Sequence, residues 1–318
     1  MTRDKFKSSR FRIMIALGTL LTLSVYSCAT VSQPRGPQLP PAPLPTYSQG
    51  MTFVYSDGRW ETVTDNHQGV VTWSDDRDYV SSSSPDFTYR PTKWISKTRS
   101  VIRQFRSRTD LYTPSAATLW PLRSGNIAGY SETGTWTNKD GTESIYQTEW
   151  GCTVEGTERI SVMAGDFDTF KIVCKRYYVS KNNNRSYLRE AKTWNYAPAA
   201  GHYVLATTKY YYDRNPRRRE LLAVLPPLND LSAGARRQME HSFQQALERK
   251  KSGESVRWSS NKLRASVETM PTKTFKTPDG NYSRRYVQKL TLPDGQRTYY
   301  GMAVRNPDGV WIIPRQRR

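Results

Sequence analysis

The side chains that could do chemistry are few and scattered. The three histidines, His67, His202 and His241, lie in no motif with a serine or cysteine nucleophile, and the sequence contains no GxSxG, HExxH, P-loop or GxGxxG segment. Asp166 and Asp168 could form a carboxylate pair or half of a calcium loop, but the glycine and the closing glutamate of such a loop are missing. We therefore expect no enzymatic activity, no cofactor and no metal site. A hydrolase would require the fold to gather acidic residues around His202.

The thiol of Cys28 is the most specific chemical signal, because it follows a leader typical of export. Basic residues precede an uncharged apolar run, residues 13–25, which at about 1.5 Å per residue is too short to span a hydrocarbon core of about 30 Å. The segment Val25-Tyr26-Ser27-Cys28 resembles the bacterial lipobox, although Tyr26 is bulkier than the usual residue. The resemblance implies a signal peptide over residues 1–27, a diacylglycerol on Cys28 and an acyl chain such as palmitate on the new amino terminus. The alternative is an uncleaved anchor helix.

The residues after Cys28 indicate to which membrane the acyl anchor would attach the protein. Two or three acyl chains would hold the mature chain on a membrane far longer than one would. Ala29 stands where retained lipoproteins of enteric-type bacteria have Asp, so the resemblance implies the outer membrane, with the protein facing either the periplasm or the surface. Residues 28–46 contain six prolines, which favour an extended tether.

The chain beyond the tether has the composition of a folded, β-rich protein. In the whole sequence of 318 residues, hydrophobic residues make up 36% and aromatic residues 12%, and the mean hydropathy is −0.75, which excludes a polytopic membrane protein and a wholly disordered chain. Between residues 47 and 226, β-branched and aromatic runs alternate with turn signals such as Asp57-Gly58 and Asp140-Gly141. We predict a bent antiparallel β-sandwich or open-barrel module, in which only residues 95–105 have an ambiguous helical period.

Cys152 and Cys174 lie in this β-rich module and flank a predicted hairpin turn at Ala164-Gly165-Asp166. Export would place them in an oxidising compartment, and lipidation of Cys28 leaves them as an even pair. The alternative, a reactive or metal-binding thiol, lacks a nearby histidine or CxxC motif. We predict a disulfide across adjacent strands, which would contribute roughly 3 kcal/mol to stability.

Residues 227–318 predict one helix followed by a small antiparallel β-meander. Ser232 is a suitable N-cap for a helix that extends to about Lys251, and apolar residues recur along one face at three- and four-residue spacing. Three Pro-Asp-Gly triplets follow, at residues 278–280, 293–295 and 307–309, and each predicts a turn. The narrow apolar stripe favours packing of the helix on the meander over binding to a membrane surface.

The same C-terminal stretch carries a family resemblance. Its motifs are Arg257-Trp258, Val267 to Pro271, Tyr282-Ser283-Arg284-Arg285-Tyr286, Tyr300 to Arg305 and Pro307-Asp308-Gly309-Val310-Trp311. In this order they resemble the C-terminal domain of the rickettsial-type seventeen-kilodalton outer-membrane surface antigen family, over about the last seventy residues. The resemblance implies a lipid-anchored surface antigen without established enzymatic activity. The module before it is similar only to uncharacterised bacterial envelope lipoproteins.

The chain departs from that family at two positions. The two cysteines of the family fall at Ser283 and Val304 here, which lie nine residues from Leu292 and from Gly295 respectively. If Leu292 and Gly295 flank the turn, the two positions face each other across a hairpin, with a slight offset if Gly295 forms a bulge. The replacement of both cysteines together is then consistent with the loss of one disulfide that joined the two strands.

The excess of basic residues is concentrated in the C-terminal region, where residues 227–318 hold 18 basic and 8 acidic side chains. For an exported chain, the polyanions within reach are lipopolysaccharide, phospholipid headgroups and peptidoglycan, not nucleic acid. The residues that we expect to contact an anionic partner are the clustered arginines Arg217, Arg218, Arg219, Arg284 and Arg285. A merely solubilising basic surface explains the excess equally well.

Two functions from different classes follow. The first is a non-enzymatic outer-membrane lipoprotein, a surface antigen that contacts anionic envelope components. The second is a carrier held at the membrane, in which the β-rich module encloses a lipid or another small apolar ligand. An interior cavity lined by Trp and Tyr would favour the carrier, and a filled core would exclude it.

Overall fold

The computed structural model describes residues 36–314, without 78, 90, 97–100, 110–118, 138–139, 180–185, 229–230 and 278–279, and without the side chains of residues 101–109, 136 and 179. The predictions for the signal peptide, for Cys28 and for the first part of the tether lie outside the described residues. Contacts divide the chain at Pro34, and residues 35–318 form a single unit. The boundary between residues 226 and 227 therefore stays a prediction.

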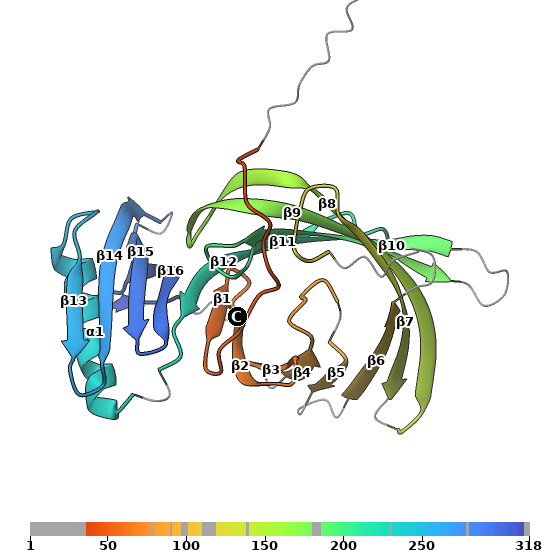
Figure 1. Cartoon of the computed structure of the whole chain (residues 1–318), viewed down its shortest axis with the longest axis horizontal. Helices are drawn as coiled ribbons and strands as arrows, with labels where there is room; N and C mark the ends of the chain where they lie inside the picture. Colours follow the sequence, from red (N-terminus) through yellow and green to blue (C-terminus); the bar gives the residue numbers. More distant parts are fainter. Residues whose placement is uncertain are drawn as a thin grey trace, which may run out of the picture. The chain divides into compact units, whose positions relative to one another are not determined.

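Twelve antiparallel strands follow the tether (Figure 1). They are β1 (Thr52–Tyr55), β2 (Trp60–His67), β3 (Val70–Asp75), β4 (Tyr79–Ser83), β5 (Lys93–Ser96), β6 (Val101–Thr109), β7 (Ile127–Thr137), β8 (Glu143–Val162), β9 (Gly165–Val179), β10 (Ser186–Ala197), β11 (His202–Tyr210) and β12 (Arg217–Leu225). Each strand pairs with the next, and β12 pairs with β1, so one continuous hydrogen-bond ladder runs through all of them. The predicted mainly β class with a strongly bent antiparallel sheet is confirmed.

Local turn chemistry explains most of these strand boundaries. Gly58 and Gly141 have φ values of 79° and 82°, which glycine adopts without steric cost, and each lies in the turn of a predicted hairpin. The ambiguous helical period over residues 95–105 is misleading, because this segment contributes to β5 and β6, in which Ile95 lies opposite Ile102. β-Branched side chains fit a paired strand better than a helix, so cross-strand pairing decides the structure here.

Aromatic side chains fill part of the space that the twelve strands surround. Residues 84–89, between β4 and β5, carry Phe87, whose ring contacts the rings of Trp120, Trp194, Tyr196 and Tyr203 at centroid distances of 5.4–6.1 Å. Tyr89 and Tyr130 stack at 4.2 Å. These aromatic contacts fill part of the interior, and Phe87, Tyr89, Trp194 and Tyr203 also line the cavity that remains.

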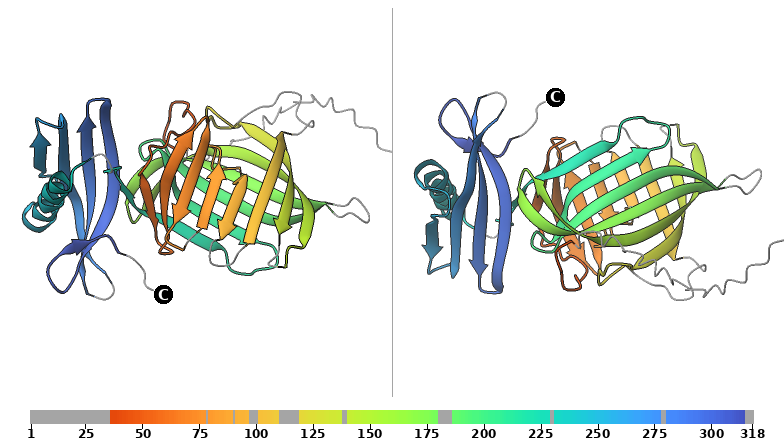
Figure 2. Two further views of the ribbon diagram at one scale, coloured as in Figure 1. Left: turned by 90° about the horizontal axis from the view of Figure 1, so that it is seen from below. Right: turned by 90° about the horizontal axis from the view of Figure 1, so that it is seen from above.

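The C-terminal region is a helix on a β-meander, as predicted. Helix α1 (Ala233–Arg249) begins at Ser232, whose hydroxyl accepts a hydrogen bond from the Ala235 amide. It packs against β13 (Val256–Ser260) and β14 (Ala265–Lys276), as Figure 2 shows. Strands β15 (Tyr282–Leu292), β16 (Gly295–Arg305) and β17 (Trp311–Ile312) complete the meander. No helix among the described residues is long and apolar enough to cross a membrane.

The meander confirms the register that the turn triplets predict. Leu292 pairs with Gly295, and from there the ladder runs without interruption to the pair Ser283–Val304. These two positions therefore lie directly opposite each other, without the offset that a bulge would cause. The residues Pro278 and Asp279 of the first triplet lie outside the described residues.

Candidate functional site

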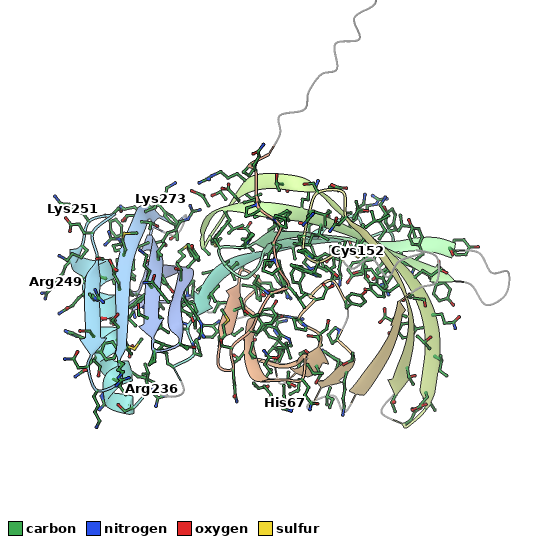
Figure 3. All side chains as sticks on the ribbon, in the orientation of Figure 1. His67, Cys152, Arg236, Arg249, Lys251 and Lys273 are labelled. Atoms are coloured by element: carbon green, nitrogen blue, oxygen red, sulfur yellow. A yellow bond between two sulfur atoms is a disulfide. The ribbon has the colours of Figure 1, made fainter. Side chains whose placement is uncertain are left out.

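The predicted disulfide between Cys152 and Cys174 is present. The two residues are directly opposed in the β8–β9 ladder, with a Cα–Cα distance of 4.0 Å. Both side chains are buried in the core, and Figure 3 shows Cys152 within the arch of the long strands. The bond joins the two longest strands of the module near their middle, and thus ties one wall of the interior together.

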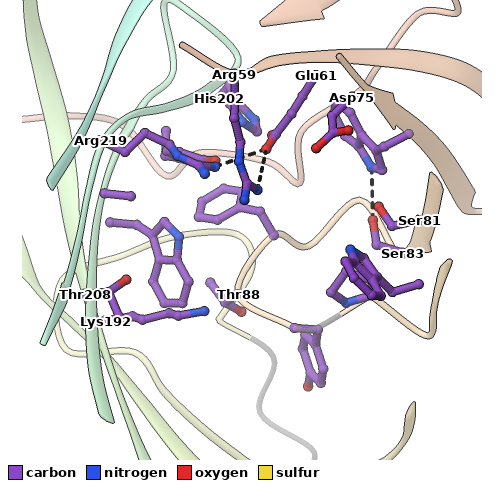
Figure 4. A pocket seen from close by; sticks show the side chains of 18 of the residues that line it. Arg59, Glu61, Asp75, Ser81, Ser83, Thr88, Lys192, His202, Thr208 and Arg219 are labelled. Carbon is purple, nitrogen blue, oxygen red and sulfur yellow. Dashed lines mark hydrogen bonds and ion pairs between the residues drawn. The ribbon is translucent and has the colours of Figure 1, made fainter. Parts of the chain in front are cut away.

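A cavity of about 700 Å³ lies inside the twelve-stranded module (Figure 4). Strands β2–β5 and the segment at residues 84–89 form one side, and strands β10–β12 with Trp150 of β8 form the other. Side chains alternate between the two faces of a strand, so every second residue of each wall faces the interior. The volume falls within the range of about 300–1,000 Å³ found for small-molecule sites.

His202 lines this cavity, is buried and is a structural residue. Its Nδ1 lies 2.8 Å from the Tyr47 hydroxyl and its Nε2 lies 2.8 Å from the Tyr55 hydroxyl. Burial, with a smaller contribution from the charge of Arg219, lowers the pKa of His202 to about 3, so the ring is neutral. One ring nitrogen then donates and the other accepts, and neither remains for a substrate.

The acidic residues that a hydrolase would need do line the same cavity, and they are Asp57, Glu61 and Asp75. Two of them are engaged with Arg219, whose guanidinium lies 3.0 Å from Asp57 Oδ2 and 3.0 Å from Glu61 Oε1. The same guanidinium lies over the ring of Tyr55, 5.0 Å from its centroid. This arrangement is a paired, half-buried charge network next to a histidine without a free nitrogen, and it favours a structural role.

Arg59 lies beside this network and is poorly paired. Among the described residues its one ion pair, with Glu61 Oε1, spans 4.0 Å, because that oxygen already accepts a hydrogen bond from Arg219. The Nε of Arg59 is buried and has no hydrogen-bond partner among the described residues. Two thirds of the side chain is buried, with 33% exposed. Figure 4 shows Arg59, from the turn before β2, and Arg219 of β12 converging on Glu61.

The other two arginines of β12 also line the cavity and are more exposed than Arg219. Arg218 pairs with Glu220 at 2.7 Å. Arg217 lies over the ring of Tyr210, 5.1 Å from its centroid, and its ion pair with Asp213 spans 3.9 Å. With 70% of its side chain exposed, Arg217 is available to solvent and to a ligand. Thus Arg217, Arg218 and Arg219 lie at one site, as their spacing suggests.

Arg284 and Arg285 lie elsewhere, in the meander. Arg284 is buried and donates to the Leu247 carbonyl in the last turn of α1. Arg285 has 14% of its side chain exposed and donates four hydrogen bonds to the turn between β8 and β9. The acceptors are the Met163 and Val162 carbonyls, the Ser161 hydroxyl and the Asp166 carboxylate. Both guanidinium groups thus have internal partners, and contact with an anionic partner stays a prediction for all five arginines.

Sequence reasoning missed the residues that make the cavity. Arg59, Glu61, Ser81 and Thr208 carried no motif, because they come from the turn before β2 and from strands β2, β4 and β11, and meet only in the fold. The run of four serines at residues 81–84 was the one visible signal, since a strand that places hydroxyls on its inner face cannot be facing an apolar core.

The comparisons with known proteins concern only part of the chain. No family model matches it. A 17 kDa surface antigen of Rickettsia felis is 38% identical over 78 residues, which are 24% of this chain and 49% of the relative. The corresponding antigen of Rickettsia bellii is 36% identical over 89 residues, which are 27% and 56% of the two chains. The chain thus spans about half the length of the curated relatives it matches.

Among solved structures, the hypothetical lipoprotein YmcC from Escherichia coli K12 matches with a TM-score of 0.35 and 10% sequence identity, over 54% of this chain and 81% of that one. The resemblance found in the sequence is confirmed: part of this chain is similar to the rickettsial 17 kDa surface antigens.

Proposed function

We propose that this protein is a non-enzymatic lipoprotein of the cell envelope that binds a small ligand in the cavity of its twelve-stranded module. The single observation that carries the proposal is the interior cavity of about 700 Å³ lined by Trp and Tyr, which a carrier requires. The lipobox-like segment at Cys28 supports an acyl anchor in the outer membrane. The partial similarity to proteins named surface antigens supports an envelope location.

Filling the cavity tests the binding function. Thr208 lines the cavity, whereas its neighbour Thr207 faces the other side of β11 and is absent from the described lining. Both positions accept an aromatic residue in terms of strand propensity. We expect Thr208→Trp to weaken ligand binding at least tenfold, because the indole occupies the ligand's space. The matched control Thr207→Trp should leave binding unchanged.

The measurement is isothermal titration calorimetry on the full chain, anchored in phosphatidylcholine nanodiscs, with empty nanodiscs as the blank. The probes are deacylated lipopolysaccharide, soluble muropeptides and the water-soluble lipid dihexanoylphosphatidylglycerol. The proposal requires that at least one probe binds wild type and Thr207→Trp and binds Thr208→Trp more weakly. If no probe binds, or if Thr208→Trp binds as wild type does, the cavity is not the binding site.

The anchor is tested separately, by growth with radioactive palmitate followed by membrane fractionation. Wild type should incorporate the label and fractionate with the outer membrane, whereas Cys28→Ser should do neither. Label in Cys28→Ser, or an unlabelled wild type, would refute the lipid anchor.

Exposed basic residues in the C-terminal region favour a second function, contact with anionic envelope polymers. Arg236, Arg249, Lys251 and Lys273 are exposed on α1, after it and on β14, as Figure 3 shows. Such contacts release counterions and weaken steeply with salt. Binding of the nanodisc-held protein to lipopolysaccharide and to peptidoglycan across a salt series tests them, and affinity that does not change with salt would exclude them.

A further inference from the structure

The lining of the cavity is unusual for a lipid carrier. Among the described lining residues there is no valine, leucine, isoleucine or methionine, and the large apolar surfaces are aromatic faces. The tryptophans that contribute them are Trp73, Trp94, Trp150 and Trp194. An acyl chain binds through continuous apolar contact worth about 0.8 kcal/mol for each buried CH₂. Here charged and hydroxyl groups interrupt that contact, so the lining does not match an acyl chain.

Aromatic faces and free hydroxyls together suit a hydroxyl-rich ring. Tyr79 and Trp94 stack at 4.5 Å in one wall and present a flat surface. The negative face of such a ring attracts the weakly positive C–H groups on the face of a sugar. The hydroxyls of Ser81 on β4 and Thr208 on β11 make no hydrogen bond with another described residue, and Figure 4 shows both beside the cavity. Each can both donate to and accept from a ligand hydroxyl.

The charges of the lining add a preference for an anion. The described lining holds six basic and three acidic side chains. The basic ones are Arg59, Arg77, Lys192, Arg217, Arg218 and Arg219, and the acidic ones are Asp57, Glu61 and Asp75. His202 is neutral and adds no charge. A cavity with this balance favours a negatively charged ligand over a neutral or positive one.

Arg59 is the side chain best suited to hold the anionic group. Arg219 already binds both nearby carboxylates, whereas Arg59 reaches Glu61 only across 4.0 Å and keeps a buried Nε without a partner. A guanidinium in this state gains most from a carboxylate or phosphate, which accepts two parallel hydrogen bonds from it. Arg217, which is exposed and also lines the cavity, would contribute further positive charge.

We infer that the cavity binds an acidic saccharide, with its ring on an aromatic face and its carboxylate or phosphate on Arg59. The inference rests on the proposed function, since it names the ligand class of the same cavity. Carboxylated sugars of peptidoglycan and phosphorylated sugars of lipopolysaccharide share this chemistry, so both are tested.

The experiment titrates the full chain in phosphatidylcholine nanodiscs with four probes: soluble muropeptides, deacylated lipopolysaccharide, the neutral sugar maltotetraose and dihexanoylphosphatidylglycerol. We expect at least one acidic saccharide to bind at least tenfold more tightly than maltotetraose. Arg59→Gln should lose at least tenfold in affinity for that saccharide, because a charge-assisted, bidentate contact is removed. Arg59→Lys keeps the positive charge but lacks the two parallel N–H donors of the guanidinium, and its affinity should fall about threefold.

The control is Arg237→Gln, which makes the same change at an arginine exposed on α1 and should bind as wild type does. Should Arg59→Gln fail to fold, Arg59→Lys carries the test, because it retains the charge beside Glu61. Full affinity in both Arg59 variants, or equal affinity for neutral and acidic sugars, overturns the inference. The proposed function survives that result if Thr208→Trp still weakens binding. Tight binding of the short lipid in place of the sugars would assign the cavity to a lipid, and no binding of any probe would remove both proposals.

Discussion

The two β regions of the molecule hold equivalent hairpins together in different ways. In β8–β9, the opposed pair Cys152–Cys174 is a disulfide, and the module around it contains a cavity. In β15–β16, the opposed pair is Ser283–Val304, and helix α1 packs over the meander. A hollow interior buries less apolar surface, and a covalent link compensates by restricting the unfolded chain. We therefore expect the meander to rely on packing and the hollow module to depend more strongly on its covalent bond.

The arginines of the two regions differ in a related way. Those of the meander, the buried Arg284 and the largely buried Arg285, donate to backbone carbonyls and so act as internal ties. Of those around the cavity, Arg59 and Arg217 have ion pairs no closer than 3.9 Å. A cluster of arginines in a sequence therefore does not identify a binding site. What identifies it is the number of partners that the fold provides for each guanidinium.

The largest expected effect is removal of the disulfide from the hollow module. Because the bond closes a loop with a sequence separation of 22 residues, Cys152→Ala/Cys174→Ala should lower the free energy of unfolding by about 3 kcal/mol. Urea denaturation under oxidising conditions measures this change. Wild type in a reducing agent should lose a similar amount, and an unchanged midpoint in both would show that packing alone stabilises the module.

The next largest effect is expected from removing the hydrogen bonds by which Arg285 joins the meander to the β8–β9 turn. Arg285→Ala removes four hydrogen bonds and leaves the Val162 and Met163 carbonyls without this donor, so we expect a loss of about 2–3 kcal/mol. Urea denaturation measures the change. Arg159→Ala is the matched control: it breaks one exposed ion pair, with Asp168 at 3.1 Å, and should cost less than about 1 kcal/mol. Equal losses in the two variants would contradict the role of Arg285 as a tie.

Acid should weaken the hollow module through His202. Its folded pKa of about 3 lies below the unfolded value near 6.5, so below pH 6.5 the unfolded chain binds a proton that the folded chain does not. Stability therefore falls as the pH drops from about 6.5 toward 3, by about 2 kcal/mol between pH 7 and pH 5. Denaturation at several pH values measures the slope. In His202→Gln the free energy of unfolding should depend less steeply on pH, by the contribution of about one proton. A pH dependence identical to that of wild type would show that His202 does not titrate in this way.

The smallest effect is expected from restoring a disulfide to the meander. Ser283→Cys/Val304→Cys joins directly opposed residues, and it removes a buried Ser283 hydroxyl that has no hydrogen-bond partner among the described residues. We expect a gain of about 1 kcal/mol under oxidising conditions, because engineered disulfides deliver less than the entropy estimate. Non-reducing mass spectrometry shows whether the bond forms. A gain as large as the loss from the Cys152–Cys174 variant would mean that the meander is no better packed than the hollow module.

Several features could be predicted because they depend on neighbours in the sequence. The turn at Asp57-Gly58, the N-cap at Ser232 and the register that places Ser283 opposite Val304 all follow from local backbone preferences. Residues 95–105 could not be read correctly, since their period alone does not distinguish a helix from two short strands. In the structure β5 pairs with β4, and β6 pairs with β7. This pairing with other strands decided that the segment forms two strands and not a helix.

The sequence by itself determined most of the strands, the helix, the cysteine pair and the partial similarity to surface antigens, because each depends on a short run of residues. Only the tertiary structure decided that the β-rich module is hollow and that Arg59 faces the cavity while Arg285 is used as a tie. The physical reason is that the free energy of a buried charge depends on which acceptors surround it. For these arginines the acceptors range from Glu61, two residues away, to Asp166, more than a hundred residues away.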